Sequence, residues 1–283
     1  MKTAALITHG HPETASEGVA AAVKAAEAAS WRLVTTPEEI AKHGDAASGI
    51  EEIERLPETP DLCLVLGGDG SILFGMRHYA GTEVPVFGIN YGTVGFLAAA
   101  ERADLQEGLR AAFAEEFEVM TLPGLEVPSL QRVGGKVGLN DVVLLRRPQD
   151  RVAELSCRIA GEEVGHVRCD GLVVATPAGS TGYNLANQGP ILAWGVAGCV
   201  VSFIAPHTLT ARALVVAPTD TIEVGNEAGR DPVELALDGE LAATIPPGES
   251  VEIHYREGVG CLAQLPGSNF YRRVGEKFGM LTR

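Results

Sequence analysis

The apolar run Leu62–Leu66 is followed directly by the turn residues Gly67, Gly68, Asp69 and Gly70. A run of this length suits a buried strand. The glycines break the strand into a tight turn, because glycine adopts positive φ angles and lets other atoms approach its backbone. A wholly apolar strand that ends in this way before a helical segment is typical of a parallel sheet. This region is therefore constrained to an alternating α/β arrangement.

The strand-then-helix order recurs on both sides of this turn. Asp69 and Asn90 each follow a predicted strand, so both should lie at the carboxyl edge of one parallel sheet, where ligands bind in such folds. The sequence predicts strands over residues 3–8, 61–66 and 84–90, and helices over 16–30, 71–79 and 103–117.

From Thr121 the pattern changes to short β-rich runs separated by glycine and proline, which indicates a mostly antiparallel second domain. We predict an α/β domain over 1–121, a β-rich domain over 122–265, and a tail over 266–283 that packs back on the first domain. The expected strands of the second domain are 152–159, 172–176, 199–205, 214–217, 233–237 and 251–255, and the tail carries a short element over 270–277.

Composition limits the class of partner. A chain of 283 residues with 46% hydrophobic content can build two cores. A net charge of -15 disfavours nucleic acid, whose phosphates attract basic surfaces. A small anionic ligand remains compatible, since local amides can bind it. No apolar stretch reaches about 18 residues and the five cysteines form no C-x-x-C pair, so we expect no membrane contact, reduced thiols and a cytoplasmic location.

Asp69 has two interpretations. Its carboxylate can act as a base toward an anionic ligand that approaches the glycine turn, or it can simply cap the following helix, which is the commoner role of an isolated Asp in a turn. A second glycine-rich stretch, 88–97, follows the next strand. A third, 170–184, combines hydroxyls with Tyr183, which could stack on a base. Taken singly, each of these two stretches also fits an ordinary loop or a helix start.

Several familiar sites are absent from the sequence. Neither G-x-G-x-x-G nor G-x-x-x-x-G-K-[ST] occurs, which excludes the two commonest nucleotide loops. Ser180 misses the G-x-S-x-G pattern of serine hydrolases by one residue. His9 and His11 have no evident third ligand, so we predict no metal site built by the protein.

In this order along the chain, the motifs resemble the NAD kinase family. They are GGDGS at 67–71, GINYGTVGFL at 88–97, LNDVVL at 139–144, CDGLVVATPAGSTGYNLA at 169–186 and APHTL at 205–209. The resemblance implies transfer of a phosphoryl group from ATP or polyphosphate to the 2'-hydroxyl of the adenosine ribose of NAD, which gives NADP. It also implies an α/β domain followed by a β-rich domain, Mg²⁺ or another divalent cation delivered with the donor, and a homodimer or homotetramer.

By this resemblance, Asp69 is the general base on the ribose hydroxyl. The residues implied in NAD binding are Asp69, Gly70, Phe96, Asn140, Asp141, Arg151, Arg168, Asp170, Ala178, Thr181, Gly182, Tyr183, Asn184, Leu185, Ala186, Ala205 and Glu240. Gly182 stands where the family more often has Ala, and Glu240 where Gln is common. A kinase with another acceptor and a non-catalytic NADP sensor remain the alternatives. Donor preference and the choice between NAD and NADH stay open.

Overall fold

The computed structural model describes residues 1–8, 10–133, 137–227 and 229–279. The chain forms two compact units: unit 1 comprises Met1–Thr121 and Gly260–Arg283, and unit 2 comprises Leu122–Val259. The predicted β-rich domain ends at 265, whereas the division between the units falls after Val259, inside the long strand β18 (Ser250–Gln264). The chain passes between the units in β18 and in β7 (Glu118–Glu126).

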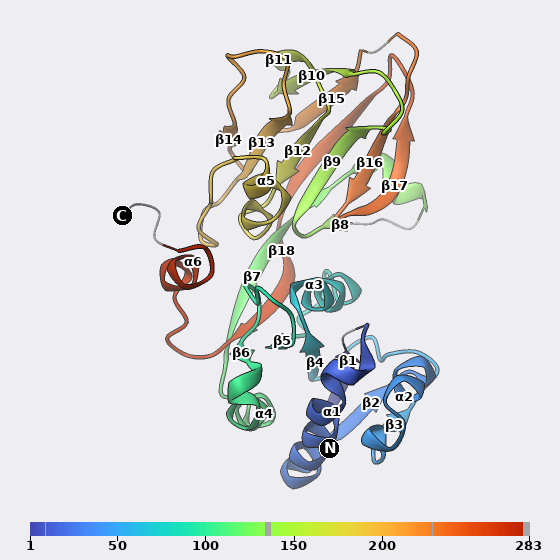
Figure 1. The fold of residues 1–283 in the computed structure, drawn as a ribbon, viewed down its shortest axis with the longest axis vertical. Coiled ribbons are helices and arrows are strands. Elements are labelled where there is room, and N and C mark those ends of the chain that lie inside the picture. The colour runs from blue at the N-terminus through green and yellow to red at the C-terminus, as the bar shows by residue number, and fades with distance from the viewer. Residues whose placement is uncertain (9, 134–136, 228, 280–283) are drawn as a thin grey trace. The chain divides into compact units, whose positions relative to one another are not determined.

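Unit 1 is an α/β unit, which confirms the predicted fold class (Figure 1). Its sheet has the order β18-β5-β4-β1-β2-β3, and every adjacent pair is parallel. The other strands of this sheet are β1 (Thr3–Thr8), β2 (Arg32–Thr35), β3 (Glu51–Glu52), β4 (Leu62–Gly67) and β5 (Val86–Asn90), with β6 (Ala100–Glu101) paired to β5. The helices are α1 (Pro12–Ala29), α2 (Pro37–His43), α3 (Asp69–His78), α4 (Leu105–Ala114) and α6 (Phe270–Phe278), with 3₁₀ turns at Gly44–Ala47 and Arg102–Asp104.

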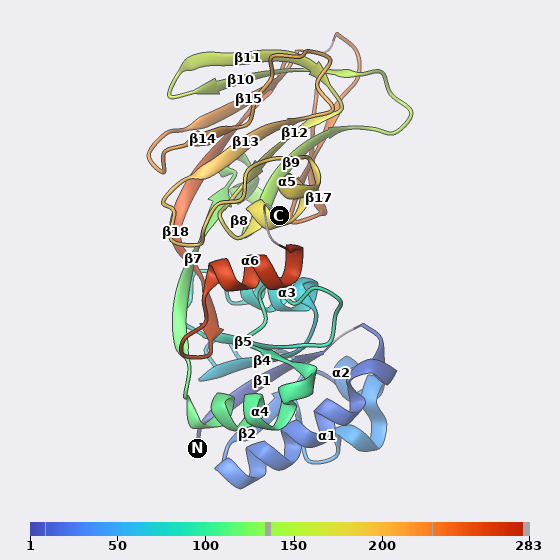
Figure 2. The same ribbon diagram turned by 60° about the vertical axis from the view of Figure 1, so that its left-hand side comes forward.

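The sheet of unit 1 is covered on both faces, as Figure 2 shows: α1 and α4 lie on one face and α3 on the other. Leu64 and Phe87 face the α1 and α4 side with the buried Leu109 of α4. Cys63 and Val65 point to the opposite face, where they lie close to Gly75 of α3. Alternate side chains of one strand therefore fill two separate layers, which is why the strand sequence is apolar throughout.

Unit 2 contains two antiparallel sheets with a common core, which confirms the predicted β-rich fold. One sheet has the order β11-β10-β15-β18 and the other β14-β13-β12-β9-β16-β17. The strands are β8 (Val137–Gly138), β9 (Asp141–Arg146), β10 (Ala153–Ile159), β11 (Glu162–Cys169), β12 (Gly171–Ala175), β13 (Cys199–Ile204), β14 (Leu214–Val216), β15 (Ile222–Asn226), β16 (Val233–Leu237) and β17 (Glu240–Ile245). Short helical turns occur at Pro128–Val133, Gly179–Thr181 and α5 (Tyr183–Ala186).

The second sheet of unit 2 is apolar on both faces. Val142 and Leu144 of β9 point into the core between the two sheets, where Leu155 and Val224 of the first sheet also lie. Val143 points the other way and packs in a smaller cluster with Leu192. The segment after β12, which carries the predicted binding motif, thus lies against the outer face of this sheet. Within the described ranges, no helix is both long and apolar enough for a membrane crossing.

Candidate functional site

In unit 1, Asp69 is the first residue of α3 and comes directly after β4 and Gly68. Its Oδ2 accepts the Phe96 N–H at 2.9 Å and its Oδ1 accepts the Leu97 N–H at 2.7 Å. A carboxylate oxygen has two lone-pair sites, so each oxygen can accept one more hydrogen bond. Asp69 is partly exposed and Gly70 is exposed. The carboxylate is therefore fixed in direction and still open to a ligand.

The two glycine-rich stretches of unit 1 meet at their backbones. A Cβ on Gly92 would lie only 2.9 Å from the Cα of Gly68, closer than real Cβ atoms approach. Gly95 has a φ of +67°, and a Cβ there would lie 2.1 Å from Nδ2 of Asn90. The Asn90 amide in turn accepts the Gly92 N–H at 2.9 Å. Glycine is thus required at these positions by close packing as well as by conformation.

Phe96 contributes its main chain, since its ring is only 3% exposed. The ring packs against Phe270 and Phe278 of α6, with centroid distances of 5.7 and 5.4 Å. The family resemblance implies Phe96 in NAD binding. In unit 1, its N–H donates to Asp69 and its carbonyl accepts a hydrogen bond from Arg273.

In unit 2, Asp238 fixes the turn that carries the predicted pair Asn140 and Asp141. Its carboxylate accepts the N–H groups of Leu139, Asn140 and Asp141 at 2.9, 2.7 and 3.0 Å. Asp238 has a φ of +48°, an uncommon conformation that Asp tolerates better than most residues. Three backbone donors on one carboxylate make this turn a rigid element.

Asp141 is 6% exposed. Burial, together with the nearby negative charge of Asp238, raises the pKa of Asp141 to about 7. A large share of Asp141 side chains is therefore protonated at neutral pH, and a protonated carboxyl can donate a hydrogen bond as well as accept one.

Asn140 joins this turn to the segment after β12. Its backbone carbonyl accepts the Thr176 N–H at 2.8 Å, and a Cβ on Gly179 would lie 1.9 Å from the same oxygen. The Asn140 Oδ1 is buried and accepts no hydrogen bond from the described residues. Since buried polar atoms nearly always have a partner, this oxygen is a candidate for contact with a ligand.

The segment Thr181–Ala186 presents one aromatic ring to solvent and buries one amide. Tyr183 is 40% exposed. Asn184 is fully buried: its Nδ2 donates to Ser180 O and Pro190 O, and its Oδ1 accepts the Ser202 hydroxyl at 3.0 Å. The Asn184 side chain therefore supports the segment from inside. Among the other predicted residues here, Ala178 is buried, Thr181 and Leu185 are half-buried, and Gly182 and Ala186 are exposed.

The remaining predicted residues of unit 2 lie on neighbouring strands or loops. Arg168 and Asp170 flank the end of β11, and the Arg168 carbonyl accepts the His207 N–H at 2.7 Å, which brings the stretch after Ala205 alongside them. Asp170 is half-buried and forms an ion pair with Arg146 at 2.6 Å. Ala205 is exposed with a φ of +44°, Arg151 is exposed before β10, and Glu240 is exposed at the start of β17.

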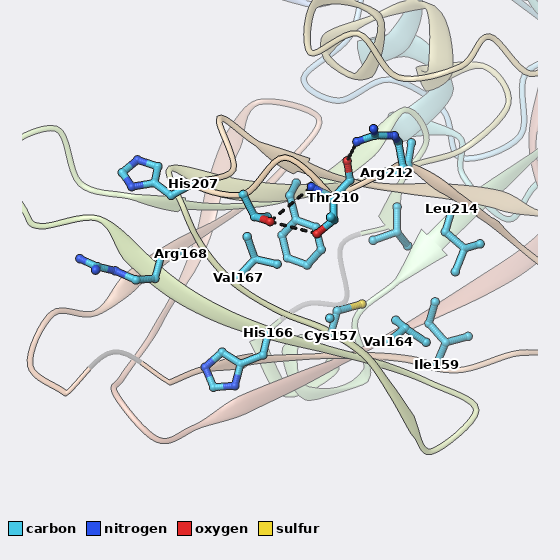
Figure 3. A pocket seen from close by; sticks show the side chains of 16 residues that line it. Cys157, Ile159, Val164, His166, Val167, Arg168, His207, Thr210, Arg212 and Leu214 are labelled. Atoms are coloured by element: carbon cyan, nitrogen blue, oxygen red, sulfur yellow. Dashed lines mark hydrogen bonds between the residues drawn. The ribbon is translucent and has the colours of Figure 1, made fainter.

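A hollow of about 610 Å³ lies within unit 2 beside β11 and the segment 207–214. Figure 3 shows Arg168 and His207 at one end of this hollow and Ile159, Val164 and Leu214 at the other. The hollow thus combines the Arg168 guanidinium and the His207 imidazole with an apolar wall, and Arg168 is its link to the predicted binding residues.

Sequence reasoning missed Asp238 and Arg146 as site residues. Asp238–Gly239 follows β16 and precedes β17, and Asp-Gly between two strands is a strong hairpin signal. That signal predicts the turn but not the contact with Asp141, which is 97 residues away in the sequence. Arg146 ends β9 without any distinctive motif. The described residues contain no group of three or more His, Cys, Asp or Glu side chains placed to hold a metal ion.

Comparison with known proteins decides the family. Residues 16–117 match the family model described as the ATP-NAD kinase N-terminal domain, and residues 139–258 match the ATP-NAD kinase C-terminal domain. A NAD kinase of Rhodopirellula baltica is 34% identical over 222 residues, which cover 77% of this chain and 71% of that protein. The chain belongs to the NAD kinase family. It is therefore a kinase, an enzyme that transfers a phosphoryl group.

Other NAD kinase relatives agree with this assignment. The NAD kinase of Thermomicrobium roseum is 38% identical over 228 residues, which cover 79% of this chain and 77% of that protein. The fold is similar to that of yeast NADH kinase, crystallised with NADH, at a TM-score of 0.85 and 20% identity, over 100% of this chain and 89% of that one. It is also similar to an Archaeoglobus fulgidus NAD kinase in complex with ATP, at a TM-score of 0.74 and 24% identity, over 97% and 98%.

Proposed function

We propose that this chain phosphorylates the 2'-hydroxyl of the adenosine ribose of NAD to form NADP, with ATP as the phosphoryl donor and Mg²⁺ bound to the donor phosphates. The observation that carries the proposal is the geometry of Asp69. Its carboxylate is oriented by two backbone N–H groups and keeps unused lone pairs at a turn without side chains on either flank. Family membership supplies the substrate class.

Asp69 is the proposed general base. A ribose hydroxyl is a weak nucleophile at neutral pH, and a carboxylate within hydrogen-bond reach removes its proton as the oxygen–phosphorus bond forms. The bond between the phosphoryl group and the rest of the donor breaks in the same transfer. A positioned base contributes a factor of about 10² to 10⁴ in rate. The rest of the acceleration is expected from alignment of donor and acceptor.

The residues at the start of α3 give indirect support to ATP and Mg²⁺ as parts of the proposal. Mg²⁺ prefers oxygen ligands and is commonly held by substrate phosphates together with one or two carboxylates. Such an ion needs no complete cage of protein ligands. The start of α3, with the exposed Gly70 beside Asp69, offers backbone N–H groups toward which phosphate oxygens are attracted.

We assign dinucleotide binding to the unit 2 residues of the family motifs. The Asn140 Oδ1 can accept a hydrogen bond, and the Asp141 carboxyl, whose pKa is raised by burial, can accept or donate one; the partners are ribose hydroxyls or the nicotinamide side of the dinucleotide. The exposed ring of Tyr183 can stack on adenine. The resemblance also leads us to propose a homodimer or homotetramer in the cytoplasm, and light scattering in solution tests the oligomeric state.

Formation of NADP is the direct test. The purified chain is incubated with NAD and Mg-ATP, and with GTP or polyphosphate in parallel, and NADP is measured with an NADP-specific dehydrogenase. We expect NADP with ATP and none when the divalent cation is chelated. Binding of NADP without its formation from any donor would instead favour the non-catalytic sensor. Phosphorylation of another alcohol, but not of NAD, would favour a kinase with a different acceptor.

A further inference from the structure

Asp69 is held by a loop whose other side is fixed by α6. The N–H groups of Phe96 and Leu97 point to Asp69, whereas the carbonyls of Phe96 and Ala98 each accept a hydrogen bond at 2.6 Å from the guanidinium of Arg273. The carbonyl of Leu97 accepts the Gln264 Nε2 at 2.8 Å. All of these groups belong to unit 1.

Gln264 is hydrogen-bonded both to the loop and to Arg273. Its Oε1 accepts a hydrogen bond from Arg273 at 2.7 Å, so the amide and the guanidinium orient each other. Gln264 is 3% exposed, and Phe96 and Leu97 are 3% and 4% exposed. Hydrogen bonds in such a dry environment are strong and hold a defined geometry.

One peptide group connects Arg273 to Asp69. In the peptide group between Phe96 and Leu97, the C=O accepts a hydrogen bond from Arg273 and the N–H donates one to Oδ1 of Asp69. A peptide group is planar and trans, so a bond that fixes its carbonyl also fixes the direction of its N–H. A charged donor on the carbonyl further polarises the N–H and strengthens the second hydrogen bond.

The rest of α6 holds Arg273 in place. Asn269 caps the helix by accepting the N–H groups of Tyr271 and Arg272 at 2.9 and 3.1 Å. Lys277 donates to Glu101 at 2.6 Å, and the same carboxylate accepts the Asn90 amide at 2.8 Å. Burial lowers the pKa of Arg273, an effect opposed by the carboxylates of Asp69, Glu101 and Glu276. Arginine still remains charged under physiological conditions.

We infer that Arg273 is a positioning residue for phosphoryl transfer: through the Phe96–Leu97 peptide it holds the Asp69 carboxylate in the orientation that accepts the ribose proton. The inference rests on the proposed role of Asp69. We expect a larger effect on turnover than on NAD binding, because the guanidinium bonds to the loop that orients the base. Misplacement of a reacting group by about 1 Å costs on the order of 10² in rate.

The test compares Arg273→Met with Arg272→Met in the chain of 283 residues. Arg272 is the exposed neighbour on the same helix, so its variant removes the same charge without touching the loop. We expect Arg273→Met to lower kcat by about 10- to 100-fold while KM and Kd for NAD change less than about threefold. Arg272→Met should keep kcat within about twofold of the wild type. Arg273→Lys, which retains the charge but lacks the planar fork, should recover part of the loss.

The outcomes distinguish failure of the proposed function from failure of the positioning role of Arg273. If the wild type makes no NADP, the proposed function fails. If the wild type and Arg272→Met make NADP and Arg273→Met does so at the same kcat, only the positioning role fails. A loss that appears mainly in KM also overturns it. Should Arg273→Met not fold, Arg273→Lys decides, since a kcat within about twofold of the wild type would leave the planar fork without a role.

Discussion

The two units use carboxylates in opposite ways. In unit 1, Asp69 is partly exposed, is oriented by two N–H groups and lies in a turn that glycines keep open. In unit 2, Asp141 is 6% exposed and the Asp238 carboxylate accepts hydrogen bonds from three backbone N–H groups. The first arrangement keeps a carboxylate available for a substrate, whereas in the second the Asp238 carboxylate builds a rigid turn. Changes in unit 1 should therefore act on turnover, and changes in unit 2 on stability and binding.

The largest effect is expected for Asp69→Asn. The amide keeps the size of the side chain but cannot remove a proton, so kcat should fall by about 10² to 10⁴. The variant should fold normally and still bind NAD, as circular dichroism and calorimetry would show. Retention of more than about a tenth of the wild-type rate would contradict the assignment of Asp69 as the base. Unit 1 would then not differ from unit 2 in having a carboxylate that acts on the substrate.

Asp238→Ala should act on stability instead. Loss of this carboxylate strands backbone donors in the turn 139–141, and alanine at a φ of +48° adds strain, so the free energy of unfolding should fall by about 2–4 kcal/mol. Asp238→Asn is the matched control, because it keeps one acceptor and tolerates the left-handed conformation. Its loss should be about half as large in urea denaturation. Equal stability of Asp238→Ala and the wild type would show that the turn holds without this carboxylate.

Asp141→Asn tests the buried carboxyl through pH. The folded pKa is about 7 and the unfolded one about 3.9, so between these values the unfolded chain releases a proton that the folded chain retains. The stability contributed by Asp141 is therefore full below about pH 4, falls as pH rises to about 7, and stays low above it. Asparagine does not titrate. Above pH 7, the variant should be more stable than the wild type by on the order of 1–4 kcal/mol.

Urea denaturation without ligand, repeated from pH 5 to 8, measures this difference. Asp45→Asn removes the same charge at an exposed position of unit 1 and serves as the control. Its stability should follow the wild type across the range. If the free energy of unfolding of Asp141→Asn and of the wild type changed with pH in the same way, Asp141 would titrate as an ordinary exposed carboxyl. The burial of Asp141 in unit 2 would then have no effect on stability.

The sequence predicts the local part of this arrangement well. The apolar run before Gly67 specifies a buried strand, and the glycines specify the turn, because both signals reside in adjacent residues. In unit 1, the strands β2, β3 and β6 and the helix α2 were not predicted, and in unit 2 the strands β8, β9, β11, β15 and β17 were not. β2 and β3 are very short, and β3 consists of Glu51 and Glu52, so neither carries enough periodic signal.

The non-local part could not be predicted. Asp238 reaches a turn 97 residues away, and Arg273 reaches Phe96 across 177 residues. Such contacts depend on the order of strands in a sheet and on where the tail packs, and neither is encoded in the local pattern. Asn184 shows the same limit. A polar residue within a binding motif suggests a ligand contact, yet burial turns its amide toward Ser180 and Ser202.

Tyr183→Ala is expected to have the smallest effect. It tests whether unit 2 acts on NAD binding and not on turnover. Tyr183 is 40% exposed, and loss of a base–aromatic stack weakens binding by about 1–3 kcal/mol, which calorimetry with NAD measures. Tyr183→Phe keeps the ring and should bind like the wild type. At saturating NAD, kcat of Tyr183→Ala should stay within about threefold, since the base lies on another unit. An unchanged Kd would remove Tyr183 from the binding site, and a loss confined to kcat would mean that unit 2 also shapes the chemical step.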